Sequence, residues 1–154
     1  MDIKEVYLKL SMLCSRKEYC ISDVEKKLDI WKIGEEKQGQ IIKDLIAEKF
    51  IDETRFVEAF VKDKFRFNRW GRNKIRYHLK QKRISDNLIN KALDSIQEID
   101  YQKVVKELLI TKNRNLKAKD NYERKTKLIR FMVQRGFEYD ALNNEIDDLF
   151  CAAE

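Results

Sequence analysis

The residues with the clearest potential for chemistry are lysines and arginines that gather in two segments of this 154-residue chain. Residues 62–83 hold ten basic and one acidic side chain, a net charge of +9, and residues 103–130 hold ten basic and three acidic ones, a net of +7. The whole chain carries only +6, so the rest is acidic on balance. A basic segment on a mixed surface attracts polyanions. The two segments therefore predict contact with nucleic acid or with a nucleoprotein surface, against the alternative of ordinary solvated helix faces.

Aromatic residues are interleaved with the charges of residues 62–83. We expect Phe65, Trp70 and Tyr77 to lie mostly in the hydrophobic core. Trp31 and Trp70 could stack on nucleic-acid bases, but each sits beside apolar positions of the helical pattern, which favours core packing. The interleaving favours a binding role for this segment without identifying a partner.

Residues that could catalyse a reaction or bind a metal are scarce. No phosphate-binding loop, zinc-protease or serine-hydrolase motif occurs, and the only histidine, His78, has no carboxylate or nucleophile at motif spacing. We therefore predict neither enzymatic activity nor a cofactor. Cys14, Cys20 and Cys151 are an odd number of cysteines, and a metal site would need a fourth ligand. We expect reduced thiols, buried as small apolar residues, in a cytoplasmic protein without a membrane span or export signal.

Helices must position these side chains, because the chain has only four glycines and no proline. Three-four hydrophobic spacing predicts nine helices along nearly the whole chain. Ser22, with Glu25 three residues later, has the spacing of a capping box, and Asp52 and Ser85 are predicted to begin later helices. Arg55, one turn after Asp52, is interpreted as local helix support rather than as part of a binding site.

The nine predicted helices form three sets of three, in which Leu28, Leu79 and Phe131 occupy matching positions 51 and 52 residues apart. Such a period is typical of helical repeats. The predicted architecture is all-α, with three tandem three-helix repeats, each resembling a helix-turn-helix unit, over residues 1–51, 52–98 and 99–154. No helix is apolar on every side, so we expect a monomer. A helix-turn-helix transcription regulator, which would prefer a particular duplex, remains an alternative.

Several segments are similar to the RecX family of recombinase regulators. Ile51–Phe60 resembles that family's pattern I/L-D-D/E-x-R-Y/F-A-x-x-F, and the run that begins with Trp70–Ile75 resembles its G-x-x-x-I-x-x-x-L-x-x-K stretch. Lys127–Phe137 resembles the family's K-L-x-R-F-L-x-R-R-G-F stretch, and Ser22–Leu28 matches the helix start of its first repeat. One departure is Arg83, since many members have glycine after the matching lysine.

The resemblance implies an elongated, curved module of three tandem three-helix units that lies along the groove of the RecA filament on single-stranded DNA. It implies a negative regulator that inhibits ATP hydrolysis, strand exchange and co-protease activity of RecA, and so modulates homologous recombination, DNA repair and the SOS response. Some members also bind DNA weakly. A repeat protein suits a repeating filament, because linked weak contacts add through effective concentration.

The predicted contact residues are the basic side chains that would face acidic RecA surface or DNA phosphates, although each could equally be a solvated surface charge. They are Arg66, Arg69, Arg72, Lys74, Arg76, Lys80 and Lys82, followed by Arg114, Lys117, Lys119, Arg124, Lys125 and Lys127.

Overall fold

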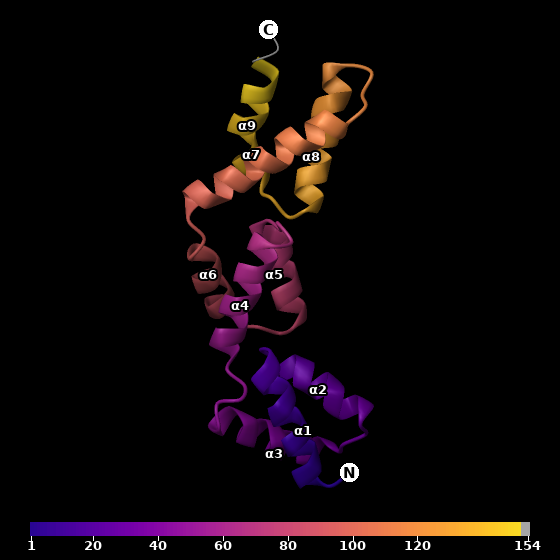
Figure 1. The fold of residues 1–154 in the computed structure, drawn as a ribbon, viewed down its shortest axis with the longest axis vertical. Coiled ribbons are helices and arrows are strands. Elements are labelled where there is room, and N and C mark those ends of the chain that lie inside the picture. The colour runs from indigo at the N-terminus through magenta and orange to yellow at the C-terminus, as the bar shows by residue number, and fades with distance from the viewer. Residues whose placement is uncertain (152–154) are drawn as a thin grey trace. The chain divides into compact units, whose positions relative to one another are not determined.

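The computed structural model describes residues 1–151, and within that range it contains nine α-helices and no strand (Figure 1). The helices are α1 (Ile3–Arg16), α2 (Ile21–Ile30), α3 (Glu35–Ala47), α4 (Glu53–Arg66), α5 (Arg72–Gln81), α6 (Asp86–Asp94), α7 (Glu98–Asn115), α8 (Asn121–Gln134) and α9 (Tyr139–Cys151). The predicted all-α fold is confirmed. None of these helices is both long and apolar enough to cross a membrane.

Contacts divide the chain into two compact units. The first unit comprises residues 1–60 and 79–89, and the second comprises residues 61–78 and the chain from residue 90 onward. Helices α4, α5 and α6 each contribute residues to both units. The repeat boundaries expected after residues 51 and 98 stay a prediction.

The core of the first three helices follows directly from the hydrophobic spacing. Its fully or nearly buried members are Val6, Leu10 and Cys14 on α1, Val24 and Leu28 on α2, Ile41 and Leu45 on α3, and Ile51 beyond α3. Neighbours three or four residues apart lie on one face of a helix, so each helix buries one stripe against the other two. Burial of each such aliphatic side chain contributes about 1.5–3 kcal/mol.

The middle helix of each set ends in the same backbone geometry. The residues with positive φ at these ends are Lys32 (58°), Arg83 (59°) and Gly136 (97°). After each of them, a backbone N–H donates to the carbonyl five residues back: Ile33 to Leu28 at 3.0 Å, Ile84 to Leu79 at 3.2 Å and Phe137 to Met132 at 3.1 Å. This is the left-handed helix cap that satisfies otherwise unpaired carbonyl groups.

These caps fix the register of the repeat. Leu28, Leu79 and Met132 occupy the same position relative to the cap, and each is fully buried. They lie 51 and 53 residues apart. The predicted match at Phe131 is wrong by one residue, because Phe131 lies beside the buried stripe of α8 and is only half-buried.

The predicted capping box at Ser22 is wrong, because α2 begins earlier. Cys20 is the N-cap, and the Asp23 carboxylate accepts a hydrogen bond from the Cys20 N–H at 3.4 Å. Ser22 lies inside the helix and is buried. The helix start therefore has the acidic partner of a capping box, with a thiol in place of the usual hydroxyl.

The predicted caps at Asp52 and Ser85 are confirmed. Asp52 Oδ1 accepts from the Arg55 N–H at 3.1 Å, and Ser85 Oγ accepts from the Leu88 N–H at 3.4 Å. The Arg55 guanidinium donates to the carbonyl of Lys49 at 3.0 Å and pairs with Glu18 at 3.0 Å, so its role is structural, as expected, but extends beyond its own helix.

The three cysteines differ in exposure. Cys14 and Cys20 are buried, as predicted, and burial raises the pKa of both thiols. Cys151 is exposed, so the expectation that it is buried is wrong. It lies five residues after Ile146, which ends the buried stripe of α9, and five residues turn a helix away from its buried face.

Candidate functional site

In the second unit, the turn before α5 docks onto the turn that follows α8. The Gly71 N–H donates to the carbonyl of Arg135 at 2.8 Å, and the Asn73 N–H donates to the carbonyl of Gly136 at 2.9 Å. In return, Arg135 Nε donates to the carbonyl of Arg69 at 3.3 Å. Backbone hydrogen bonds and the Arg135 side chain therefore connect the second and third sets of helices, and we call this contact the joint of the second unit.

Two glycines permit this close approach. A Cβ atom on Gly71 would lie 2.4 Å from backbone atoms of Gly136, and one on Gly136 would lie 2.4 Å from Lys74. Both distances are far inside van der Waals contact. Gly136 also adopts a φ of 97°, which an L-residue with a side chain rarely takes.

Arg72, one of the predicted contact residues, is engaged inside the second unit. Its guanidinium pairs with Glu98 at 2.8 Å and with Glu138 at 2.9 Å, and it lies 3.8 Å from the ring centroid of Tyr101. The Arg72 N–H donates to Tyr101 Oη at 3.0 Å, and that hydroxyl in turn donates to Glu138. Burial and the hydrogen bond to Glu138 hold the pKa of Tyr101 well above its usual value. Arg72 thus clamps α5 to α7 and to the turn before α9.

A second joint lies in the first unit, between α2 and the turn after α5. Lys82 pairs with Asp23 at 2.6 Å, and Arg83 pairs with Glu25 at 3.1 Å. Burial alone would raise the pKa of Asp23, but hydrogen bonds from Lys82 and Cys20 outweigh it and hold the pKa below its usual value. This joint is held by ionic side chains, whereas the joint of the second unit combines ion pairs with backbone hydrogen bonds.

The two joints share one feature. In each joint, the first backbone N–H of the middle helix has no acceptor within its own helix. A side chain near the start of the next set accepts a hydrogen bond from it. The Ile21 N–H donates to Glu53 at 3.2 Å in the first unit, and the Arg72 N–H donates to Tyr101 at 3.0 Å in the second. Successive sets therefore meet through equivalent positions, as expected for a helical repeat.

In the second basic segment, two of the predicted contact residues, Arg124 and Lys127, stabilise the loop between α7 and α8. Arg124 Nη1 donates to the carbonyl groups of Asn113 at 3.1 Å and Leu116 at 3.2 Å, and so satisfies acceptors at the end of α7. Lys127 Nζ donates to the carbonyl of Lys117 at 3.0 Å. Both side chains stabilise the connection from α7 to α8.

Three further predicted side chains make surface contacts: Arg69 with Glu107 at 3.1 Å, Lys80 with Asp86 at 3.3 Å, and Arg76 with Asn90. Exposed ion pairs contribute about 0–1 kcal/mol, so a phosphate could replace such a partner at little cost. Within residues 1–151, five predicted residues are exposed and make no ion pair: Arg66, Arg114, Lys117, Lys119 and Lys125. These five are the best placed to meet a polyanion.

The aromatic residues of the first basic segment are not all in the core. Phe65 is buried and Trp70 is half-buried, but Tyr77 is 60% exposed, so its predicted core position is wrong. Ile75 and Leu79 form the buried stripe of α5, and Tyr77 lies midway between them, on the opposite face of the helix. Trp31 packs against the core of the first three helices, as expected.

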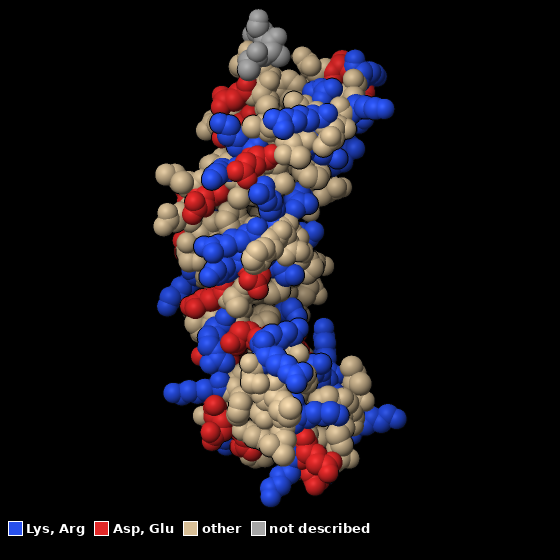
Figure 2. All heavy atoms as spheres, viewed as in Figure 1, with Lys and Arg blue, Asp and Glu red and all other residues tan. Residues whose placement is uncertain are grey.

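Lysine and arginine side chains cover much of the surface in Figure 2, with carboxylates among them.

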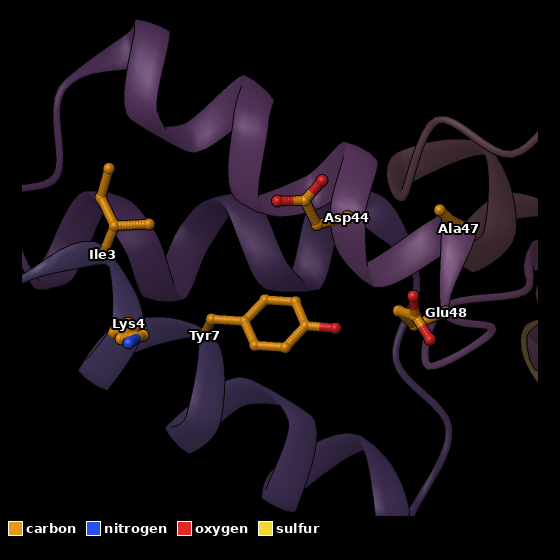
Figure 3. A pocket seen from close by; sticks show the side chains of 6 residues that line it. All are labelled: Ile3, Lys4, Tyr7, Asp44, Ala47 and Glu48. Atoms are coloured by element: carbon orange, nitrogen blue, oxygen red, sulfur yellow. The ribbon is translucent and has the colours of Figure 1, made fainter.

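A separate groove lies in the first unit between α1 and α3, where the Tyr7 ring extends toward α3 with Asp44 and Glu48 nearby (Figure 3). Burial, Glu48 and Asp44 raise the pKa of Tyr7. None of the predicted contact residues lines this groove. Among residues 1–151, no group of three or more histidine, cysteine or acidic side chains could hold a metal ion.

The fold and the site together define an all-α protein of three-helix units whose basic residues are concentrated in two segments of the sequence. The family models for the second and third three-helix domains of RecX match residues 52–93 and 98–143. Regulatory protein RecX of Acinetobacter baylyi is 30% identical over 134 residues, which cover 87% of this chain and 81% of that protein. The chain belongs to the RecX family.

Further relatives agree with this assignment. Regulatory protein RecX of Clostridium botulinum is 32% identical over 127 residues, covering 81% of this chain. The chain spans only 59% of the length of two such clostridial relatives. The crystal structure of RecX from Lactobacillus salivarius has the same fold, with a TM-score of 0.84 at 22% identity over 97% of each chain.

Proposed function

We propose that this protein is a negative regulator of RecA. It binds the groove of the RecA filament on single-stranded DNA and inhibits ATP hydrolysis, strand exchange and co-protease activity, and thereby modulates homologous recombination, DNA repair and the SOS response. Membership of the RecX family is the observation that carries the proposal. The protein acts in the cytoplasm as a monomer, without catalysing a reaction or using a cofactor, and binds bare DNA weakly.

The contacts of the basic side chains divide the predicted contact residues into two groups: residues that stabilise the protein and residues that contact the filament. Arg72, Lys82 and Arg124 maintain the joints and the loop, because their partners lie within the protein. The five exposed residues without ion pairs, together with Lys74 and the loosely paired Arg69, Arg76 and Lys80, make the contact with the filament. Charge complementarity at exposed sites gives rapid, salt-dependent association with a polyanion.

A helix-turn-helix transcription regulator is less compatible with the charges. In such proteins the second helix of the motif enters the major groove with its N-terminal residues. The corresponding third helix of each set begins here with acidic residues: Glu35 and Glu36 on α3, Asp86 on α6 and Asp140 on α9. These carboxylates would repel DNA phosphates at the point of entry.

Charge reversal tests the proposed contact surface. The combined substitutions Arg66→Glu, Lys117→Glu, Lys119→Glu and Lys125→Glu should weaken binding to RecA filaments on single-stranded DNA by roughly tenfold or more and reduce its salt dependence. Binding is followed by fluorescence anisotropy of the labelled protein, and circular dichroism checks the helix content. The matched control reverses four lysines that are exposed in the first unit: Lys4, Lys26, Lys37 and Lys43. If both variants lost equal affinity for the filament, or the first variant lost none, the four substituted residues would not form the contact surface.

A further inference from the structure

Three aromatic rings contact one another in the second unit, in the middle of the first basic segment. The indole of Trp70 stacks on the imidazole of His78, with ring centroids 4.6 Å apart and planes inclined by 29°. The Tyr77 ring meets His78 edge-on, with centroids 5.4 Å apart and planes at 89°. The chain of rings runs from the half-buried Trp70 to Tyr77, which is 60% exposed.

Two ammonium groups lie against the Trp70 end of this chain of rings. Lys64 Nζ lies 4.9 Å from the centroid of the Trp70 ring, and Lys74 Nζ lies 4.7 Å from it. Cations at such distances are attracted to the face of an indole, which holds their long side chains beside the rings. The cluster therefore combines an exposed ring with fixed positive charge.

The fold itself does not require an aromatic residue at position 77. Ile75 and Leu79 supply the buried stripe of α5, and both are fully buried. An exposed tyrosine on the opposite face leaves much of its ring in water. A tyrosine in this position offers a rigid apolar ring face together with a polar hydroxyl, a combination that is enriched at binding interfaces.

The chemistry of the cluster selects the class of ligand. Proteins that bind single-stranded nucleic acid place bases on aromatic rings and phosphates on nearby cations. A duplex keeps its base faces stacked inside, and an acidic protein surface would engage the lysines without needing the ring. Single-stranded DNA satisfies both parts of the cluster.

We propose that Tyr77 stacks on an unpaired base of single-stranded DNA while Lys64 and Lys74 bind the adjoining phosphates. The inference rests on the proposed function, since the filament carries such a strand, but it assigns a contact to bases that charge alone does not provide. It also operates on bare DNA, so it can be measured without RecA.

The test compares two probes of equal length and charge: a fluorescent oligothymidylate and an abasic oligonucleotide that has the same phosphates but no bases. Tyr77→Ala should weaken binding to oligothymidylate by roughly five- to hundredfold and leave binding to the abasic probe unchanged. Tyr77→Phe, which keeps the ring, should bind both probes like the parent. The matched control is Tyr139→Ala, which removes an equally exposed tyrosine of the same unit outside both basic segments and should change neither affinity.

The location of the strand is tested in a Trp31→Phe background, in which Trp70 is the remaining tryptophan. Its emission should change when oligothymidylate binds, because Lys64 and Lys74 lie against the indole, and Tyr77→Ala should reduce this change to that seen with the abasic probe. Equal losses on both probes for Tyr77→Ala, no loss on either, or a loss equal to that of Tyr139→Ala would each contradict the stacking site. If the parent protein shows the expected pattern but does not inhibit RecA, the proposed function fails and the base-stacking site stands.

Discussion

Replacement of Gly71 by alanine is expected to lower the free energy of unfolding of the second unit by about 3 kcal/mol. The new Cβ would lie 2.4 Å from the backbone of Gly136 and Phe137, and neither backbone can rotate away as a side chain could. The two turns must separate, which breaks the hydrogen bonds that Gly71 and Asn73 donate. Urea denaturation followed by helical circular dichroism measures the loss.

Gly39→Ala is the control for Gly71→Ala. Gly39 lies within α3, and an added Cβ there would meet no atom within 4 Å. Alanine has the higher helix propensity, so this variant should be more stable than the parent by up to about 1 kcal/mol. A Gly71→Ala protein as stable as the parent would contradict the close docking of the two turns.

Arg72→Met is expected to lower the free energy of unfolding by about 2 kcal/mol, even though methionine preserves much of the apolar contact of the arginine stem. Only 20% of the Arg72 side chain is exposed, and its removal leaves Glu138 without one of its hydrogen-bond donors. The pair with Glu98 contributes little, because the Glu98 side chain is 72% exposed.

A double-mutant cycle separates the contribution of Glu138. Arg72→Met combined with Glu138→Gln should show a coupling energy of about 1–2 kcal/mol, measured by the same urea titrations. If Arg72→Met left stability unchanged and instead weakened filament binding, Arg72 would be a contact residue for the partner, and its role as a clamp would be contradicted.

Local features of this fold were predictable from the sequence, because they depend on residues within one or two turns of each other. The stripes of α1 and α3, and the caps at Asp52 and Ser85, follow from spacing alone. The errors at Ser22 and Phe131 are displacements by one or two residues, since a capping pattern and a buried stripe can each be continued in more than one register.

The joints could not be predicted in the same way. Arg72 and Glu138 are 66 residues apart, and Lys82 and Asp23 are 59 apart, so their contact depends on how successive sets pack. The sequence shows where positive charge gathers, but it does not show which charges are neutralised by carboxylates across a joint. The exposed position of Tyr77 is different, because it follows from local spacing: Ile75 and Leu79 set the buried face of α5, and Tyr77 lies midway between them.

The proposed regulation of RecA is tested most directly by the rate of ATP hydrolysis by RecA on single-stranded DNA with increasing amounts of this protein. Hydrolysis is expected to slow at substoichiometric ratios of protein to RecA, because one bound module affects a filament of many subunits. The four-residue charge-reversal variant should need a higher ratio for the same effect. Unchanged hydrolysis at every ratio would contradict the account.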